Sequence, residues 1–276
     1  MRYLPTLIIP IILSIAVQAQ PAGPVPVSDK PVFVPVEKTV CYNLGNKKIP
    51  VKSLQYGAER EIVYINLHDS EPTSYNAARI VLASSGGTLL KIENKGRRNI
   101  RFQLNKITYS FDPNRIFSRA GIEQTLRESG KTSKAAINEV EKFSKWILQL
   151  IPESTSCIVS LHNNTDGDYS IKTYLPGGKR QMDAKAVYED SLQDMDDIIF
   201  TTDSLLFYKM ANYCYNSILQ DNVNVKKDGS LSVYFGERNR RYINIETEHG
   251  KLDKHLEMIE KLLSVLTDQH SYTYTE

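Results

Sequence analysis

Short apolar runs alternate with longer amphipathic stretches along most of this chain, and this alternation limits the fold more than any other feature. Residues 61–67 and 156–161 have the length and apolar content of buried strands, whereas residues 73–85 and 132–151 carry apolar side chains at helical spacing. Further strands are predicted at residues 88–92 and 99–104, and further helices at residues 203–220 and 252–266. Strands that alternate with helices are typical of a sheet covered on both faces. The sequence therefore predicts one α/β domain with a mixed, largely parallel sheet.

The N-terminus has the order of a secretory signal peptide. Arg2 is followed by an apolar run over residues 7–17 and by a cleavage motif that ends at Ala19. The run is shorter than the roughly 20 residues that cross a bilayer, and prolines interrupt it. We therefore expect a signal peptide over residues 1–19, no stable membrane span after its cleavage, and a secreted or periplasmic location.

A proline-rich stretch follows the predicted cleavage site. Five of the 12 prolines fall between Pro21 and Pro35. Proline has a fixed φ and no backbone N–H, so this stretch favours an extended leader over a helix or a central strand. We assign residues 20–58 to an N-terminal arm and residues 59–276 to the folded domain.

Composition and missing motifs exclude several classes of function. The 34 basic residues nearly balance the 32 acidic ones, which gives a formal net charge of +2 and does not indicate a nucleic-acid partner. Three cysteines without a CxxC motif cannot form a thiolate zinc site, and they allow at most one disulfide. The sequence contains no GxSxG motif and no nucleotide-binding glycine motif, so covalent serine catalysis and nucleotide cofactors lack support.

Three of the predicted strands end in residues that can carry out chemistry. Residues 61–67 lead into His68 and Glu71, residues 156–161 lead into His162, and the run RYINI leads into Glu246. In an open α/β sheet, ligands bind beyond the carboxyl ends of the strands, so these side chains converge if the strands are parallel neighbours. Two imidazoles and one carboxylate would give Zn²⁺ three protein ligands and leave a fourth position open.

A loop presents the first pair of these residues. Glu71 lies three residues after His68 and directly before Pro72, which favours an extended conformation. The pair therefore differs from HExxH, in which both histidines lie on one helix. Taken alone, HxxE is a weak signal, because His68 could cap a helix and Glu71 could be a solvated acid in its first turn.

Four short motifs in order resemble the zinc carboxypeptidase superfamily, which contains carboxypeptidases and aspartoacylase-like deacylases. They are His68-x-x-Glu71, the segment from Asp112 to Phe117, the lone His162 and the late Glu246. The resemblance covers roughly residues 60 to 265, so residues 59–276 would form a zinc-carboxypeptidase-like catalytic domain.

The resemblance implies roles for particular residues. It implies that His68, Glu71 and His162 bind Zn²⁺, and that Asn114 and Arg115 hold a substrate carboxylate. The planar guanidinium of arginine suits that task, because it can donate two parallel hydrogen bonds to a carboxylate. In isolation, the Asp-Pro-Asn segment would instead be a simple turn with a surface arginine.

The late glutamate would act as general base and acid. Glu246 is preferred because it directly follows the alternating apolar residues Ile243 and Ile245 of its strand. Glu248, on the same face, remains the alternative. Arg98 would polarise the scissile carbonyl, with Arg97 and Arg101 as competitors. A tyrosine on a mobile segment would complete a carboxypeptidase site.

For that tyrosine the candidate is Tyr234, although packing is the commoner role of a tyrosine. Residues 163–179 are rich in turn formers and are expected to form a loop over the cleft.

These expectations add up to a secreted zinc hydrolase that cleaves an amide bond beside a free carboxylate, with a peptide or a small acylated amino acid as substrate. A carboxypeptidase acting on peptides or cell-wall peptide stems is preferred. One alternative is an aspartoacylase-like N-acyl amino acid deacylase. The other is a metal-free module that binds peptide termini.

Overall fold

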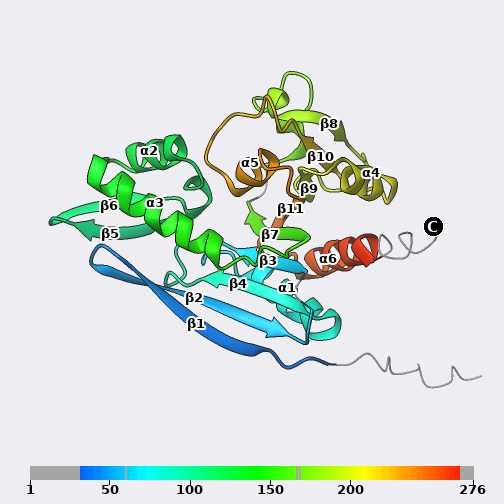
Figure 1. Cartoon of the computed structure of the whole chain (residues 1–276). Helices are drawn as coiled ribbons and strands as arrows, with labels where there is room; N and C mark the ends of the chain where they lie inside the picture. The colour runs from blue at the N-terminus through cyan, green and yellow to red at the C-terminus, as the bar shows by residue number, and fades with distance from the viewer. Residues whose placement is uncertain (1–31, 60, 166, 168, 268–276) are drawn as a thin grey trace, which may run out of the picture. The chain divides into compact units, whose positions relative to one another are not determined.

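The computed structural model describes residues 32–59, 61–165, 167 and 169–267 (Figure 1). The predicted signal peptide, residues 1–19, lies outside the described residues. The strands are β1 Val36–Leu44, β2 Lys47–Tyr56, β3 Ile62–Asn66, β4 Gly87–Ile92, β5 Ile100–Leu104, β6 Ile107–Phe111, β7 Cys157–Asn164, β8 Ala184–Tyr188, β9 Ile198–Thr201, β10 Ser217–Gln220 and β11 Tyr242–Glu248. The helices are α1 Pro72–Ser85, α2 Arg119–Glu128, α3 Lys134–Gln149, α4 Ser204–Asn212, α5 Leu231–Gly236 and α6 Leu252–Thr267.

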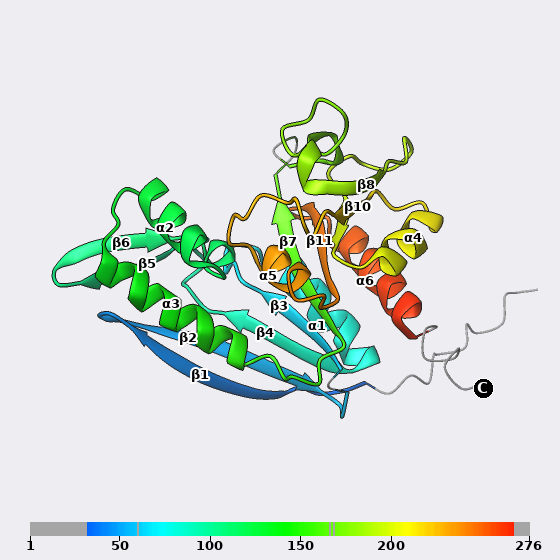
Figure 2. The same ribbon diagram turned by 45° about the horizontal axis from the view of Figure 1, so that its top comes forward.

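One mixed sheet forms the centre of the domain. Within the described ranges it has nine strands in the order β1-β2-β4-β3-β7-β11-β9-β10-β8. Strands β4, β3, β7 and β11 are parallel neighbours in its middle, and β2 and β9 flank them in the antiparallel direction. Strands β7 and β11 run side by side in both ribbon views (Figures 1 and 2). This arrangement confirms the predicted α/β class, in which the parallel strands are central.

Helices cover both faces of the sheet, as predicted. Helices α2, α3 and α5 pack on one face, where Val63 and Ile65 of β3 point. Helices α1, α4 and α6 pack on the other face, where Tyr64 points. Successive residues of a strand point to opposite faces, so each central strand contributes apolar side chains to both cores. No helix in the described part of the chain is long and apolar enough to cross a membrane.

The N-terminal boundary of the domain differs from the prediction. Residues 36–56 of the predicted arm form β1 and β2, and β2 pairs with β4, so this segment belongs to the sheet. The proline cluster that favoured an arm ends at Pro35, before β1 begins. Ile49 and Val51 of β2 have exposed fractions of 0% and 2%, so this strand is part of the core. The prediction of an arm up to residue 58 is therefore wrong for residues 36–56.

The predicted helix over residues 203–220 is also too long. Helix α4 ends at Asn212, and residues 217–220 form β10. Cys214 has a φ of 62°, and this left-handed conformation ends the helical path and turns the chain into the strand. The other predicted strands and helices agree with the structure to within a few residues. All three cysteines are free.

His255 of α6 is a fully buried imidazole. Its Nδ1 lies 2.6 Å from Oγ1 of Thr247, and its Nε2 has no hydrogen-bond partner within the described residues. Burial, and to a smaller extent the positive charge of a protonated His162, lowers the pKa of His255 to about 3. The folded protein therefore keeps this side chain neutral at pH values where the unfolded chain protonates it.

We predict that His255→Leu flattens the acid limb of the stability curve. A histidine whose pKa is depressed on folding contributes stability that is present above its unfolded pKa of about 6.5 and is lost as the pH falls toward its folded pKa. Between pH 7 and pH 4 the variant should lose about 3 kcal/mol less unfolding free energy than the wild type. Urea denaturation across this range measures the difference.

The exposed His249 supplies the control, because His249→Leu removes an imidazole that stays in water in both states. An equal pH slope in the wild type and in His255→Leu would show that burial of this imidazole does not cause the acid sensitivity.

Candidate metal centre

The turn between β3 and α1 presents His68 and Glu71. The backbone N–H of Glu71 donates to the carbonyl of His68 at 3.2 Å, so the segment closes into a tight turn. Glu71 then occupies the N-cap position of α1, and Pro72 follows at the first helical position, where a missing N–H costs nothing. The pair therefore lies on a loop, as the proline in the sequence predicts.

Three side chains from distant parts of the chain meet at this turn. The Nδ1 atoms of His68 and His162 lie 3.0 Å apart, and the two carboxylate oxygens of Glu71 each lie 2.9 Å from one of them. All three residues are almost completely buried, with exposures of 0%, 1% and 3% for His68, Glu71 and His162. The parallel pairing of β3 with β7 brings them together, as expected from the strand ends.

Each histidine is oriented through its second ring nitrogen. Nε2 of His68 lies 2.7 Å from Oδ1 of Asp112, and Nε2 of His162 lies 3.0 Å from Oγ of Ser160. If each Nε2–H donates to that oxygen, both Nδ1 lone pairs point at the carboxylate of Glu71. Metal-bound histidines usually donate their other N–H to such a partner.

This donor set fits a divalent ion. Two imidazole lone pairs and a carboxylate at 2.9–3.0 Å repel one another unless a proton or a cation lies between them. Tetrahedral Zn²⁺ holds donor atoms about 3.3 Å apart, which is close to the observed spacing. His68, Glu71 and His162 could therefore hold Zn²⁺, and Glu71 and His162 also line an open cavity.

The opposite charges of His68 and Glu71 stabilise each other's ionised forms. Burial alone would raise the pKa of Glu71, but the adjacent His68 and His162 outweigh it and hold that pKa well below its ordinary value. Burial alone would lower the pKa of His68, but Glu71 and Asp112 raise it to about 9. Glu71 is thus ionised at neutral pH, and a metal ion would displace the proton that His68 otherwise carries.

Glu246 lies beside His162 on the neighbouring strand. The two residues are register partners in the parallel pair β7 and β11, so their side chains point to the same face of the sheet. Nδ2 of Asn244 donates to Oε1 of Glu246 at 2.9 Å. Burial raises the pKa of Glu246 above its ordinary value, although the nearby His162 opposes this shift.

The alternative residue, Glu248, lies elsewhere. Its Oε1 accepts from Nζ of Lys251 at 2.8 Å, and the same ammonium group donates to Asp194. Glu248 does not line the cavity, whereas Glu246 does. Of the two glutamates, only Glu246 is therefore within the candidate site.

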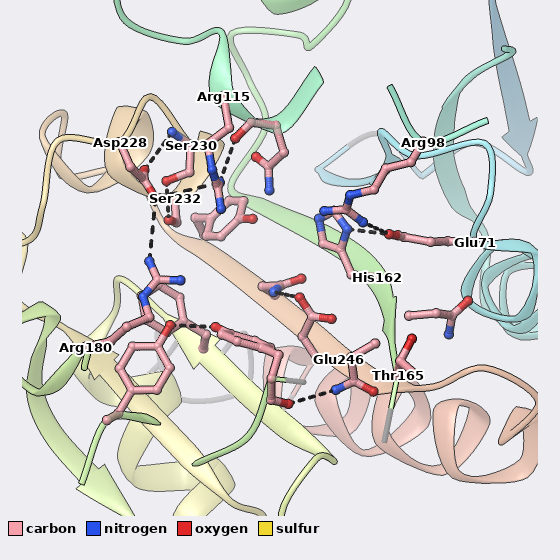
Figure 3. A pocket seen from close by; sticks show the side chains of 18 residues that line it. Glu71, Arg98, Arg115, His162, Thr165, Arg180, Asp228, Ser230, Ser232 and Glu246 are labelled. Carbon is pink, nitrogen blue, oxygen red and sulfur yellow. Dashed lines mark hydrogen bonds and ion pairs between the residues drawn. The ribbon is translucent and has the colours of Figure 1, made fainter. Parts of the chain in front are cut away.

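A cavity of about 430 Å³ opens beside the three candidate ligands (Figure 3). It is lined by Glu71, Arg98, Asn114, Arg115, His162, Asn163, Asn164, Thr165, Tyr169, Tyr174, Arg180, Phe200, Asp228, Ser230, Ser232, Tyr242, Asn244 and Glu246. Several of these residues belong to the predicted loop over residues 163–179, so that segment does border the cavity.

The structure brings Arg98 and the Asn114–Arg115 pair to the same cavity. Nη1 of Arg98 donates to Glu71 at 2.6 Å, and half of the Arg98 side chain remains exposed. The competing arginines Arg97 and Arg101 are not among the lining residues. Oδ1 of Asn114 accepts from the backbone N–H of Leu231 at 3.0 Å, which fixes the orientation of its amide.

The prediction for Tyr234 is wrong. Its ring packs 6.2 Å from that of Phe117 and lies under the guanidinium of Arg238 at 3.7 Å, outside the residues that line the cavity. Helix α5 turns this side chain toward the α3 side of the core, where it packs as an ordinary aromatic residue.

The sequence interpretation missed the residues that support the ligands. Ser160 lies two positions before His162 on the same face of β7, so strand periodicity could have identified it. Asp112 is part of the recognised segment, but no role was assigned to it. Arg180 and Asp228 come from irregular segments that carry no periodic signal.

Several solved structures match this chain at low sequence identity. No family profile and no curated protein sequence matches this chain. Among solved structures, the murein-tripeptide amidase MpaA from Escherichia coli O157 is 13% identical, covers 88% of this chain and 94% of its own, and has a TM-score of 0.44. An aspartoacylase family protein from Mesorhizobium loti is 13% identical over 87% of this chain and 68% of its own, with a TM-score of 0.44.

A third match, thrombin activatable fibrinolysis inhibitor, is 11% identical, covers 83% of this chain and 69% of its own, and has a TM-score of 0.47. The aspartoacylase family protein is of a kind that the sequence resemblance named.

We predict that Asp112→Asn weakens zinc binding. The amide accepts a weaker hydrogen bond from Nε2–H of His68 than the carboxylate does, so His68 becomes a poorer ligand, while Oδ1 can still accept from the N–H of Asn114. Zinc affinity should fall about 10–100-fold in competition with a chelating dye. Asp253→Asn, on the exposed side of α6, is the matched control. Equal affinities in all three proteins would contradict a supporting role for Asp112.

Proposed function

We propose that this chain is an exported, zinc-dependent hydrolase that cleaves an amide bond next to a free carboxylate. The observation that carries the proposal is the convergence of a buried His₂Glu set, a carboxylate on the adjacent strand and arginines around one cavity. The favoured activity is that of a metallocarboxypeptidase on peptides or cell-wall peptide stems. Export is proposed on the N-terminal sequence alone.

The ligand set has the composition of a catalytic rather than a structural zinc site. Three protein ligands leave one coordination position for water or substrate, whereas structural sites use four. Zn²⁺ bound there would supply a Lewis acid that lowers the pKa of water and polarises a carbonyl. His68, Glu71 and His162 would hold the ion, with Asp112 and Ser160 fixing the two imidazole rings.

Glu246 is the proposed general base. Its carboxylate takes a proton from the attacking water and delivers it to the nitrogen of the leaving amine. A carboxyl group with a raised pKa suits the delivery of this proton, because it is easier to protonate than an ordinary glutamate. The hydrogen bond from Asn244 keeps one carboxylate oxygen in a fixed direction.

Arginines take the two remaining roles. Arg98, at the Glu71 end of the cavity, is suited to stabilise the negative charge that develops on the carbonyl oxygen, since half of its side chain is exposed. Arg115, with the neighbouring amide of Asn114, is suited to bind the substrate carboxylate. Binding of that carboxylate positions the adjacent amide bond for attack.

Two other functions use the same residues differently. An N-acyl amino acid deacylase would need the same metal, the same base and the same carboxylate site, so only substrate length distinguishes it. A metal-free module would bind peptide termini through Asn114 and Arg115 without turnover. The base beside the ligands favours an enzyme.

The experiment is a hydrolysis screen of zinc-loaded protein against blocked peptides with free C-termini, muropeptides and N-acyl amino acids. Release of C-terminal amino acids supports the carboxypeptidase, and turnover of only the acyl amino acids supports the deacylase. No stoichiometric zinc and no turnover would leave the binding module.

We predict that Glu246→Gln lowers kcat by about 10²–10⁴-fold while zinc stays bound, because the amide cannot take the proton from water. The control is Glu248→Gln, two residues further along the same strand face, which should retain activity because that carboxylate pairs with Lys251. Zinc content and kcat are measured on both variants. A large loss in Glu248→Gln with little loss in Glu246→Gln would reverse the assignment of the base.

A further inference from the structure

The end of the cavity away from the candidate metal ligands contains two arginines around one carboxylate. Nη1 of Arg115 lies 3.7 Å, and Nη2 of Arg180 lies 3.5 Å, from the same Oδ2 of Asp228. Figure 3 shows these three residues on one side of the pocket and Glu71, Arg98 and His162 on the other. A second cationic group therefore lies close to the proposed carboxylate site of Arg115.

Contacts with neighbouring side chains hold Arg180 in a fixed position and leave some of its N–H donors unused. Its guanidinium lies 5.4 Å over the ring of Tyr174, and its Nε donates to Asp183 at 3.0 Å. Its Nη1 has no hydrogen-bond partner in the part of the chain that the structure describes. An arginine packed on an aromatic face keeps its N–H edge available and loses little further freedom on binding.

The cavity offers little to an apolar side chain. Phe200 is the only lining residue without a polar group within the described residues, and no aliphatic side chain contributes. Ser230 and Ser232 add hydroxyl groups near Asp228 at the same end. An aliphatic substrate group would thus displace water from polar surfaces and gain apolar contact only with the aromatic rings of the lining.

The N–H donors of Arg180 favour an anionic ligand. Among the lining residues, Arg98, Arg115 and Arg180 balance Glu71, Glu246 and Asp228. A divalent ion would balance Asp112 and Asp183, which pair with Arg98 and Arg180. A second carboxylate would find the unpaired donors of Arg180.

We propose that Arg180 is a specificity-determining residue that binds a second carboxylate, carried by the side chain of the residue next to the scissile bond. The preferred substrates would then end in a dicarboxylic amino acid, with one carboxylate on Arg115 and Asn114 and the other on Arg180. Asp228 keeps the two arginines apart at a fixed spacing. This inference rests on the proposed function and names its substrate class.

The test compares blocked dipeptides that differ only in a C-terminal Glu, Gln, Phe or Lys. The wild type should prefer Glu over its isosteric amide Gln by about 10–100-fold in kcat/KM, mainly through KM, because a hydrogen bond to a charged group is at stake. Arg180→Gln should remove that preference. Arg180→Lys, which keeps the charge, should retain part of it.

Arg238→Gln is the matched control, because Arg238 also lies over a tyrosine ring but outside the cavity. It should keep the wild-type preference. A second readout does not depend on turnover or on a variant: calorimetry on the wild-type protein should give tighter binding of N-acetylglutamate than of N-acetylglutamine.

The outcomes separate the two claims. Hydrolysis of the series without a preference for Glu, or a preference that survives in Arg180→Gln, overturns the role of Arg180 and leaves the proposed function standing. No hydrolysis of any peptide overturns the carboxypeptidase, whereas tighter binding of N-acetylglutamate would still support the anion site. Equal binding of the two N-acetyl compounds overturns that site directly.

Discussion

Parallel pairing of β3, β7 and β11 is the constraint on which the rest of the site depends. It aligns three carboxyl ends at one edge, so that His68 and His162, which are 94 residues apart in sequence, come within 3.0 Å of each other. The register of β7 with β11 then decides which glutamate joins them, because only residues in register point to the same face at the same level. A shift of one residue would turn His162 into the opposite core.

Burial makes this cluster of polar groups energetically costly. A histidine pair and a carboxylate without water around them are costly unless every donor has an acceptor and the charges balance. Asp112 and Ser160 satisfy the outer nitrogens, and Arg98 pairs with Glu71. The inner nitrogens face each other and one oxygen each of the Glu71 carboxylate. A divalent ion balances these groups better than a single proton does, because it satisfies both lone pairs at once.

The sequence predicts those features that follow from the spacing of apolar residues and from the position of polar residues at strand ends. The convergence of His68, Glu71, His162 and Glu246 is predictable because a buried strand precedes each group. Strand β10 falls within a predicted helix, because Cys214 gives no sequence sign of its left-handed turn. The position of the Tyr234 side chain is not predictable, because a sequence motif does not show which way a short helix points its aromatic residue. Arg180 was missed since irregular loops place side chains by tertiary contacts, which a single sequence does not reveal.

At each end of the cavity, one carboxylate lies between two basic side chains. At the metal end, an acid beside two imidazoles prepares a site for a cation, and at the far end an acid between two arginines prepares a site for anions. Asp228 lowers the mutual repulsion of Arg115 and Arg180 while the cavity is empty, so the arginines stay in position at little cost. Under the proposed function, substrate carboxylates would meet donors that are already oriented, so binding would lose less entropy. Preorganisation at the far end would then fix where the amide bond lies relative to Glu246, which would link recognition of the substrate to its chemistry.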